Sequence, residues 1–265
     1  MNRVLRLIFL GDSNVDNGNV WQLTQHTHPQ PSSIYWNGRY SNGKVWADHL
    51  AELAGCETIN LAYGCATIDN SIVAGTVPMP GGQRMEVPSL VDQMDILQQR
   101  VQQLHSSDLV FVQVGSNDLN SLIDTGSLYR RKCGYSPRRL ANRLGQAIRH
   151  LCITLGARNV VVMNVRPRED YPAVVALKDT QLRRQTREDT AQFNQIIGSE
   201  VAQLQAELGT SYHLQLFDTY AAQKEIALAA EPSLFIDGCH LGSRAQTELY
   251  KQVLEAIASQ IKLAT

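Results

Sequence analysis

Three polar residues near opposite ends of the chain have the types and order needed for nucleophilic catalysis. Ser13 supplies a hydroxyl, which becomes an effective nucleophile only when a base removes its proton. His240 is the candidate base, since Asp237 lies three residues before it and can hold the Nδ1 proton and stabilise the imidazolium. Simpler structural roles stay open, because a serine after a strand is often a helix N-cap and Asp237-Gly238 is also a turn signal.

Donors for a tetrahedral oxyanion can be assigned to short segments that each follow a predicted strand. The candidates are the backbone N–H groups of Ser13, Gly64 and Cys65 and the side-chain amide of Asn117. Glycines in these segments permit a sharp turn and leave N–H groups near helix N-termini. Because the carboxyl ends of parallel strands lie along one edge of an open sheet, we expect these segments to converge there.

Apolar runs and helical periodicity predict alternating strands and helices. Strands are predicted at residues 4–10, 58–62, 109–114, 160–165 and 213–217. Helices are predicted within residues 44–53, 89–104, 136–156, 179–208 and 221–230, and from residue 243 onward. Strands that are buried on both faces and separated by helices indicate an α/β fold of three layers, with a mostly parallel sheet and helices on both faces.

Two segments, residues 14–42 and 74–87, are rich in residues such as Gln, Asn, His, Pro and Gly and are predicted to be irregular. Loops of that length in a compact domain are usually functional or mobile. Aromatic residues of the first segment, Trp21, Tyr35 and Trp36, could either line a pocket or anchor the loop.

The composition excludes several classes of protein. Of the 265 residues, 43% are hydrophobic and 18% are charged, which is ordinary for a folded globular chain. The formal net charge is −1, which argues against nucleic acid or an anionic membrane surface as a partner. No segment approaches the roughly 18 uncharged apolar residues of a membrane span. Five scattered cysteines without CxxC spacing, and no signal peptide, predict a cytoplasmic location.

Short motifs along the chain are similar to those of one known family. FLGDS at residues 9–13, followed by DNGN at residues 16–19, forms a first block. GRYSNGKVW at residues 38–46 is similar to a GRFSNG-x-VW segment, and NLAYGCAT at residues 60–67 to an NYAxGGAT segment. In this order the blocks resemble the plant and fungal branch of the SGNH hydrolases, also called the GDSL esterase and lipase family.

Two later blocks extend the resemblance over nearly the whole chain. GSND at residues 115–118 matches the GxND block, and Asp237 with His240 matches the DxxH block. The resemblance implies a flavodoxin-like α/β/α fold in a single domain over residues 1–265. It also implies hydrolysis of carboxylic esters through an acyl-enzyme, with no cofactor or metal, by the nucleophile Ser13, the base His240 and the orienting Asp237, with Asn117 as an oxyanion donor.

The substrate is expected to be a small-molecule ester or lipid with a short to medium acyl chain. An acyltransferase of the same family would use the same acyl-enzyme with an alcohol as acceptor. A catalytically silent module that binds an ester or glycan is the alternative from another class. The intact set of Ser13, Asn117, Asp237 and His240 favours an enzyme.

Three further positions carry expectations that geometry can test. Cys65 stands where the family has the second glycine of a Gly-Gly pair, and it can still donate its N–H if its φ is negative. The favoured role of its side chain is packing as a small apolar group. Cys239, between the two acid-base residues, is expected to be a buried, inert thiol. By resemblance, Arg39 is expected to pair with Asp16 behind the nucleophile.

Overall fold

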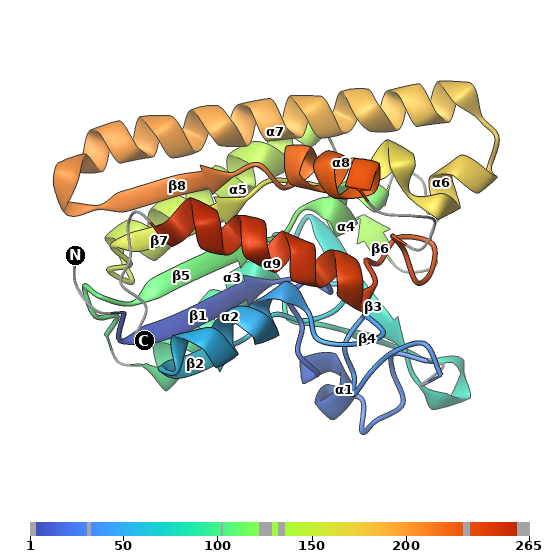
Figure 1. Ribbon diagram of the computed structural model, residues 1–265, viewed down its shortest axis with the longest axis horizontal. Coiled ribbons are helices and arrows are strands. Elements are labelled where there is room, and N and C mark those ends of the chain that lie inside the picture. Colours follow the sequence, from blue (N-terminus) through green and yellow to red (C-terminus); the bar gives the residue numbers. More distant parts are fainter. Residues whose placement is uncertain are drawn as a thin grey trace.

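The chain folds around a five-stranded parallel sheet (Figure 1). The structure is a computed structural model, and it describes residues 4–30, 33–101, 103–121, 129–131, 136–229 and 234–258. The strands are β1 (Arg6–Gly11), β2 (Glu57–Asn60), β5 (Leu109–Gln113), β7 (Asn159–Met163) and β8 (His213–Phe217). Their order is β2-β1-β5-β7-β8, with every neighbouring pair parallel. Each of them overlaps a predicted strand.

Helices cover both faces of this sheet. Along β1, Ile8 and Leu10 belong to one apolar cluster and Leu7 and Phe9 to another, because successive side chains of a strand point to opposite faces. The first face is covered by α3 (Leu90–Arg100), α5 (Pro137–Ile153) and α7 (Thr180–Leu208). The second is covered by α2 (Trp46–Ala54), α8 (Thr219–Ala229) and α9 (Ser243–Ala258). The predicted three-layer α/β/α fold is confirmed.

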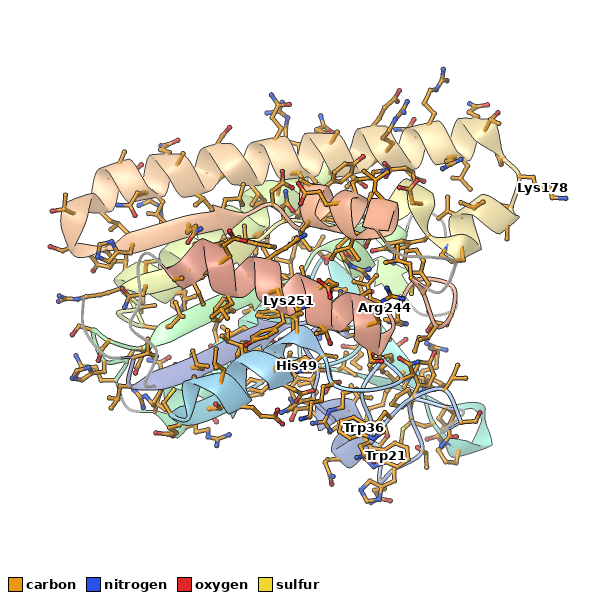
Figure 2. All side chains as sticks on the ribbon, in the orientation of Figure 1. Trp21, Trp36, His49, Lys178, Arg244 and Lys251 are labelled. Atoms are coloured by element: carbon orange, nitrogen blue, oxygen red, sulfur yellow. The ribbon has the colours of Figure 1, made fainter. Side chains whose placement is uncertain are left out.

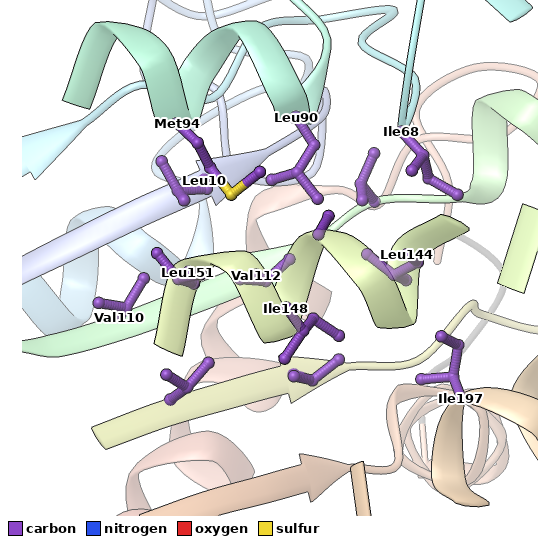
Figure 3. Packing of buried hydrophobic residues seen from close by; sticks show 14 of the residues in the cluster. Leu10, Ile68, Leu90, Met94, Val110, Val112, Leu144, Ile148, Leu151 and Ile197 are labelled. Carbon is purple, nitrogen blue, oxygen red and sulfur yellow. The ribbon is translucent and has the colours of Figure 1, made fainter. Parts of the chain in front are cut away.

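Packing between α5 and the central strands makes the sheet a rigid support. Leu144, Ile148 and Leu151 repeat at helical spacing on the buried face of α5. They face Val110 and Val112 of β5, and each of these side chains is at most 1% exposed (Figure 3). Because this packing holds the strands in place, it also sets the direction of the loop that follows each strand.

The longest helix, α7, runs along one side of the molecule (Figure 1). It buries Phe193, Ile197, Val201 and Leu204 at intervals of three or four residues, and most of its remaining surface is polar. Within the part of the chain that the structure describes, no helix has both the length and the apolar character needed to cross a bilayer.

Residues 74–87, predicted to be irregular, contribute instead to a second sheet, so that prediction is wrong. β3 (Val73–Pro78) pairs antiparallel with β4 (Arg84–Glu86) and with β6 (Tyr129–Arg131). The prolines and glycines that suggested a loop are concentrated in the turn between β3 and β4, where Pro80–Gly82 form one 3₁₀ turn. The run before them, VAGTV, is fully buried as a strand.

The described part of the first long segment, residues 14–30 and 33–42, is largely irregular as predicted and contains one short helix, α1 (Asn19–Leu23). Its tryptophans make contacts inside the segment: Trp21 stacks on His26, with ring centres 5.1 Å apart, and the Arg39 guanidinium lies 5.1 Å from the centre of the Trp36 ring. Figure 2 shows Trp21 and Trp36 at the same end of the molecule, beside α1. These contacts favour the anchoring role for both side chains.

Candidate active site

Ser13 lies in a tight turn at the carboxyl end of β1. The last residue of the strand, Gly11, has no room for a side chain, because a Cβ there would lie 2.3 Å from the Gln113 carbonyl oxygen of β5. The next N–H, that of Asp12, donates to the same oxygen at 3.1 Å. The chain therefore turns away directly from the sheet edge, where Ser13 is 6% exposed.

Asp237 organises the loop that carries His240. Its Oδ1 accepts the backbone N–H groups of Cys239 and His240, both at 2.7 Å. Its Oδ2 lies 2.6 Å from His240 Nδ1. On the other side of the ring, His240 Nε2 lies 2.9 Å from Ser13 Oγ, across a separation of 227 residues in the chain. The structure thus brings Ser13, His240 and Asp237 together in one hydrogen-bonded row.

These contacts also set the protonation of the acidic and basic groups. Burial alone would lower the pKa of His240, but Cys239 and the Asp237 carboxylate outweigh it and raise the pKa to about 10. Burial would raise the pKa of Asp237, whereas the hydrogen bond from His240 and the two backbone N–H groups hold it well below the usual range. Asp237 is therefore an ionised carboxylate beside the ring, which stabilises an imidazolium.

Two tyrosines of the first long segment pack against this pair. The Tyr35 hydroxyl donates to Asp237 Oδ2 at 2.7 Å, the same oxygen that faces His240. The Tyr40 ring centre lies 5.0 Å from that of His240, and a Cβ on Gly64 would lie 2.1 Å from the Tyr40 ring. From sequence, Tyr35 could either line a pocket or anchor the loop, and Tyr40 had no assigned role. The one available signal was the position of Tyr40 inside the GRYSNG motif.

The predicted oxyanion donors differ in their present partners. The Gly64 N–H donates to Asp16 Oδ2 at 2.8 Å, so its single hydrogen holds the turn in place. Asn117, in α4 (Ser116–Asn120), donates from Nδ2 to the Ala66 carbonyl at 2.8 Å. Among the described residues, the backbone N–H groups of Ser13 and Cys65 have no acceptor within hydrogen-bonding distance.

Cys65 adopts a left-handed backbone conformation, with φ at +64°, so the negative φ on which its N–H donation was made conditional is not found. A non-glycine residue pays about 1–2 kcal/mol for this conformation because its Cβ crowds the following carbonyl. Close packing holds the strained residue: Cys65 is 8% exposed, and its carbonyl oxygen would lie 1.9 Å from a Cβ on Gly75 of β3. Burial raises the pKa of its thiol to about 12, so the side chain is neutral.

A buried carboxylate connects the first long segment to this turn. Asp16 Oδ1 accepts the N–H groups of Gly18 and Asn19 at 2.8 and 2.6 Å, while its Oδ2 accepts that of Gly64. Burial raises the pKa of Asp16 to about 6, although these N–H donors act in the opposite direction. Asp16 therefore fixes both the segment behind the nucleophile and the turn that contains Cys65.

The predicted Arg39–Asp16 pair is wrong. Arg39 instead forms a two-bond ion pair with Asp48, with Nε 3.2 Å from Oδ2 and Nη2 3.0 Å from Oδ1. Asp48 lies in the first turn of α2, where its carboxylate also accepts the Val45 N–H. Both oxygens of the Asp16 carboxylate already accept backbone N–H groups, so the carboxylate does not require a cation as a partner.

Cys239 is only partly buried, so the expected burial of its thiol is wrong, and its inertness stays a prediction. Its Sγ lies 3.5 Å from His240 Nδ1 and 3.8 Å from His240 Nε2. Ligand atoms of Asp237, Cys239 and His240 lie within 4.8 Å of one another, and among the described residues this is the group with the composition and spacing to hold a metal ion.

Comparisons with known proteins point to one family. A sequence profile of the family described as GDSL-like lipase/acylhydrolase matches residues 7–253. The thermolabile hemolysin of Vibrio parahaemolyticus serotype O3:K6 is 24% identical over 236 residues, which are 89% of this chain and 50% of that protein. The chain spans about half the length of this relative.

Solved structures share the fold at low sequence identity. A mutant of Axe2, an acetyl-xylooligosaccharide esterase from Geobacillus stearothermophilus, superposes with a TM-score of 0.62 at 15% identity and covers 98% of each chain. A protein from Parabacteroides merdae that is described as GDSL-like gives a TM-score of 0.59 at 12% identity, with 97% of each chain covered. At these identities the likeness concerns the fold.

The packing of β3 on the Cys65 turn can be tested with Gly75→Ala. The added Cβ would meet the Cys65 carbonyl oxygen at 1.9 Å, so the backbone must shift, and we expect the free energy of unfolding to fall by about 1–3 kcal/mol. The control is Gly198→Ala in α7, where a Cβ would meet Leu216 at an ordinary 3.5 Å. That variant should be unchanged or up to about 1 kcal/mol more stable. Urea denaturation measures both, and equal stability of Gly75→Ala and wild type would contradict the close approach.

Proposed function

This chain belongs to the GDSL-like lipase/acylhydrolase family, and from that premise we propose that it hydrolyses carboxylic esters with Ser13 as the nucleophile. The observation that carries the proposal is the row of contacts from Ser13 Oγ to His240 Nε2 at 2.9 Å and from His240 Nδ1 to Asp237 Oδ2 at 2.6 Å. A base within reach of the hydroxyl and a third group that orients the base are what an activated serine requires. Because both ends of the chain contribute to one site, we treat residues 1–265 as a single domain.

In the proposed reaction, Ser13 Oγ attacks the ester carbonyl carbon while its proton passes to His240 Nε2. The Asp237 carboxylate holds the Nδ1 proton and stabilises the imidazolium. The tetrahedral intermediate collapses, the bond to the leaving alcohol breaks, and the alcohol oxygen takes the proton from Nε2. Water then attacks the acyl-enzyme with His240 as base, which releases the acid and restores Ser13.

Three groups are assigned as donors to the developing oxyanion: the backbone N–H groups of Ser13 and Cys65 and the side-chain amide of Asn117. Cys65 is assigned despite its positive φ, because its N–H has no acceptor among the described residues. Preorganised donors at this position stabilise charge that appears only in the transition state. The Gly64 N–H, also predicted as a donor, remains on Asp16 in this assignment. Gly64 then contributes by fixing the turn that presents the neighbouring Cys65 N–H.

The surroundings of the nucleophile favour a short to medium acyl chain. Tyr40 packs between Gly64 and His240 and so closes one side of the site. Ser13 and Cys65 are only 6% and 8% exposed, which leaves a narrow approach to the hydroxyl. The Axe2 esterase, by its name, removes acetyl groups from xylooligosaccharides, and an acetylated sugar is therefore a useful substrate to compare.

The nucleophile and the base are tested by Ser13→Ala and His240→Ala, with hydrolysis of p-nitrophenyl acetate as the measurement. Each variant should lose roughly 10⁴-fold or more in kcat, because removal of either member disables the same proton transfer. Ser199→Ala, which changes an exposed serine of α7, is the matched control and should keep the wild-type rate. Near-normal turnover by a folded Ser13→Ala or His240→Ala protein would refute the proposal.

Asp237 and Tyr35 should shift the pH dependence of kcat/KM in opposite directions. The Asp237 carboxylate raises the pKa of His240, so Asp237→Asn should move the rise in activity to lower pH while kcat falls by about 10²-fold or more. Tyr35→Phe removes a competing donor from Asp237 Oδ2, which strengthens the interaction with His240 and should move the rise to higher pH. Shifts of both profiles in the same direction would contradict these roles.

The acyl-chain preference can be measured with p-nitrophenyl esters from acetate to palmitate. If Tyr40 closes one side of the site, kcat/KM should be highest among the short and medium esters and should fall for palmitate. Tyr40→Ala should flatten this decline, because it removes the ring that packs on Gly64. A profile that rises toward palmitate in the wild-type protein would overturn the proposed chain length.

A further inference from the structure

Cys239 brings a sulfur atom to the imidazole ring that the proposed mechanism uses as its base. Its Sγ is 3.5 Å from His240 Nδ1 and 3.8 Å from His240 Nε2. Because these two distances are so similar, the sulfur lies beside the ring rather than in line with one nitrogen. Asp237 Oδ2 and Ser13 Oγ already face the two nitrogens, so the sulfur is a third polar neighbour of the ring.

We propose that Asp237, Cys239 and His240 form a binding site for a thiophilic divalent cation of the zinc type, and that an ion bound there blocks ester hydrolysis. Carboxylate, thiolate and imidazole are all ligands that zinc takes in proteins, and the thiolate selects against magnesium and calcium. With a Zn–S bond of about 2.3 Å and a Zn–N bond of about 2.0 Å, a tetrahedral ion separates the two ligand atoms by about 3.5 Å. The distance from Cys239 Sγ to His240 Nδ1 is 3.5 Å.

The loop that carries these ligands is already ordered. Asp237 Oδ1 fixes the N–H groups of the other two ligands, and the Ile236 N–H donates to the His240 carbonyl at 2.9 Å. A β-bridge between Phe235 and Leu241 closes the loop at its base. An ion on Nδ1 therefore has to widen the 2.6 Å gap between Asp237 Oδ2 and His240 Nδ1 to about 3.3 Å, and it has to draw Cys239 Sγ from beside the ring toward the lone pair of Nδ1.

Solvent has access to the proposed site. The side chains of His240 and Asp237 are 16% and 17% exposed, and Cys239 is partly exposed. By contrast, Cys65 and Cys152 are buried, and Cys56 immediately precedes β2, at the opposite end of the strands from Ser13. Among the described cysteines, Cys239 is thus the one whose thiol lies close to both an imidazole and a carboxylate.

Either mode of binding to the ring would remove the base. An ion on Nδ1 displaces its proton and the neutral ring then carries its hydrogen on Nε2, so Nε2 cannot accept the proton of Ser13. An ion on Nε2 occupies the lone pair directly. In both cases the Cys239 thiol loses its proton to solvent as the metal–sulfur bond forms, while Asp237 binds as a carboxylate. The block rests on the proposed function, whereas binding of the ion does not.

Binding is tested with cadmium, whose bond to a thiolate gives an ultraviolet charge-transfer band. Titration of the wild-type protein with cadmium chloride should give a saturable band, which Cys239→Ser should lose. Cys56→Ser, which removes another partly exposed thiol, should retain the full band. A band of unchanged size in Cys239→Ser, or its absence from the wild-type protein, would overturn the metal site whether or not the protein hydrolyses esters.

Inhibition is tested with zinc chloride and p-nitrophenyl acetate. Zinc should inhibit the wild-type and Cys56→Ser proteins at the same concentration, and a chelator should restore their activity. Loss of the softest ligand in Cys239→Ser should raise the zinc concentration for half-inhibition by about tenfold or more. Equal sensitivity of Cys239→Ser and wild type would exclude a role of this site in inhibition, and the cadmium titration separates that result from failure of the proposed hydrolysis.

Discussion

Parallel pairing of β1 with β5 is the constraint on which the site depends. The register places Gly11 opposite Gln113, so the two central strands end at the same level. The buried side chain of Gln93 satisfies both the N–H and the carbonyl of Gly11, at 2.7 and 2.9 Å, which lets the chain leave the sheet there. Ser13 and Asn117 consequently emerge from neighbouring strands at one edge, and His240 needs only to reach that edge.

The main elements of the fold follow from sequence patterns that match their burial. The run LVFVQ of β5 is buried at every position, and Leu144, Ile148 and Leu151 mark the inner face of α5 at helical spacing. The second sheet could not be predicted in the same way, because β4 and β6 span only three residues each and one hairpin turn concentrates proline and glycine. Pairing of β3 with β6 joins distant segments, and local propensity does not specify such a contact.

The convergence of Ser13, Asp237 and His240 could be predicted, because their residue types and order indicate contacts that one sheet edge brings together. Contacts that depend on the path of a long loop could not be predicted from the sequence. Tyr35 reaches Asp237 across 202 residues, and nothing in its local sequence indicates that contact. The positive φ of Cys65 had one signal in the sequence, its place at a family glycine position, but the close approach of β3 to its carbonyl could not be predicted.

The buried carboxylate of Asp16 has a consequence for protein engineering. One side chain accepts hydrogen bonds from Gly18, Asn19 and Gly64. The conformation of the loop after β1 therefore depends on that of the turn after β2. A chimaera that takes its first loop from a relative would inherit a carboxylate aimed at a foreign turn. Grafts should therefore exchange residues 14–42 and 62–67 together, as a single cassette.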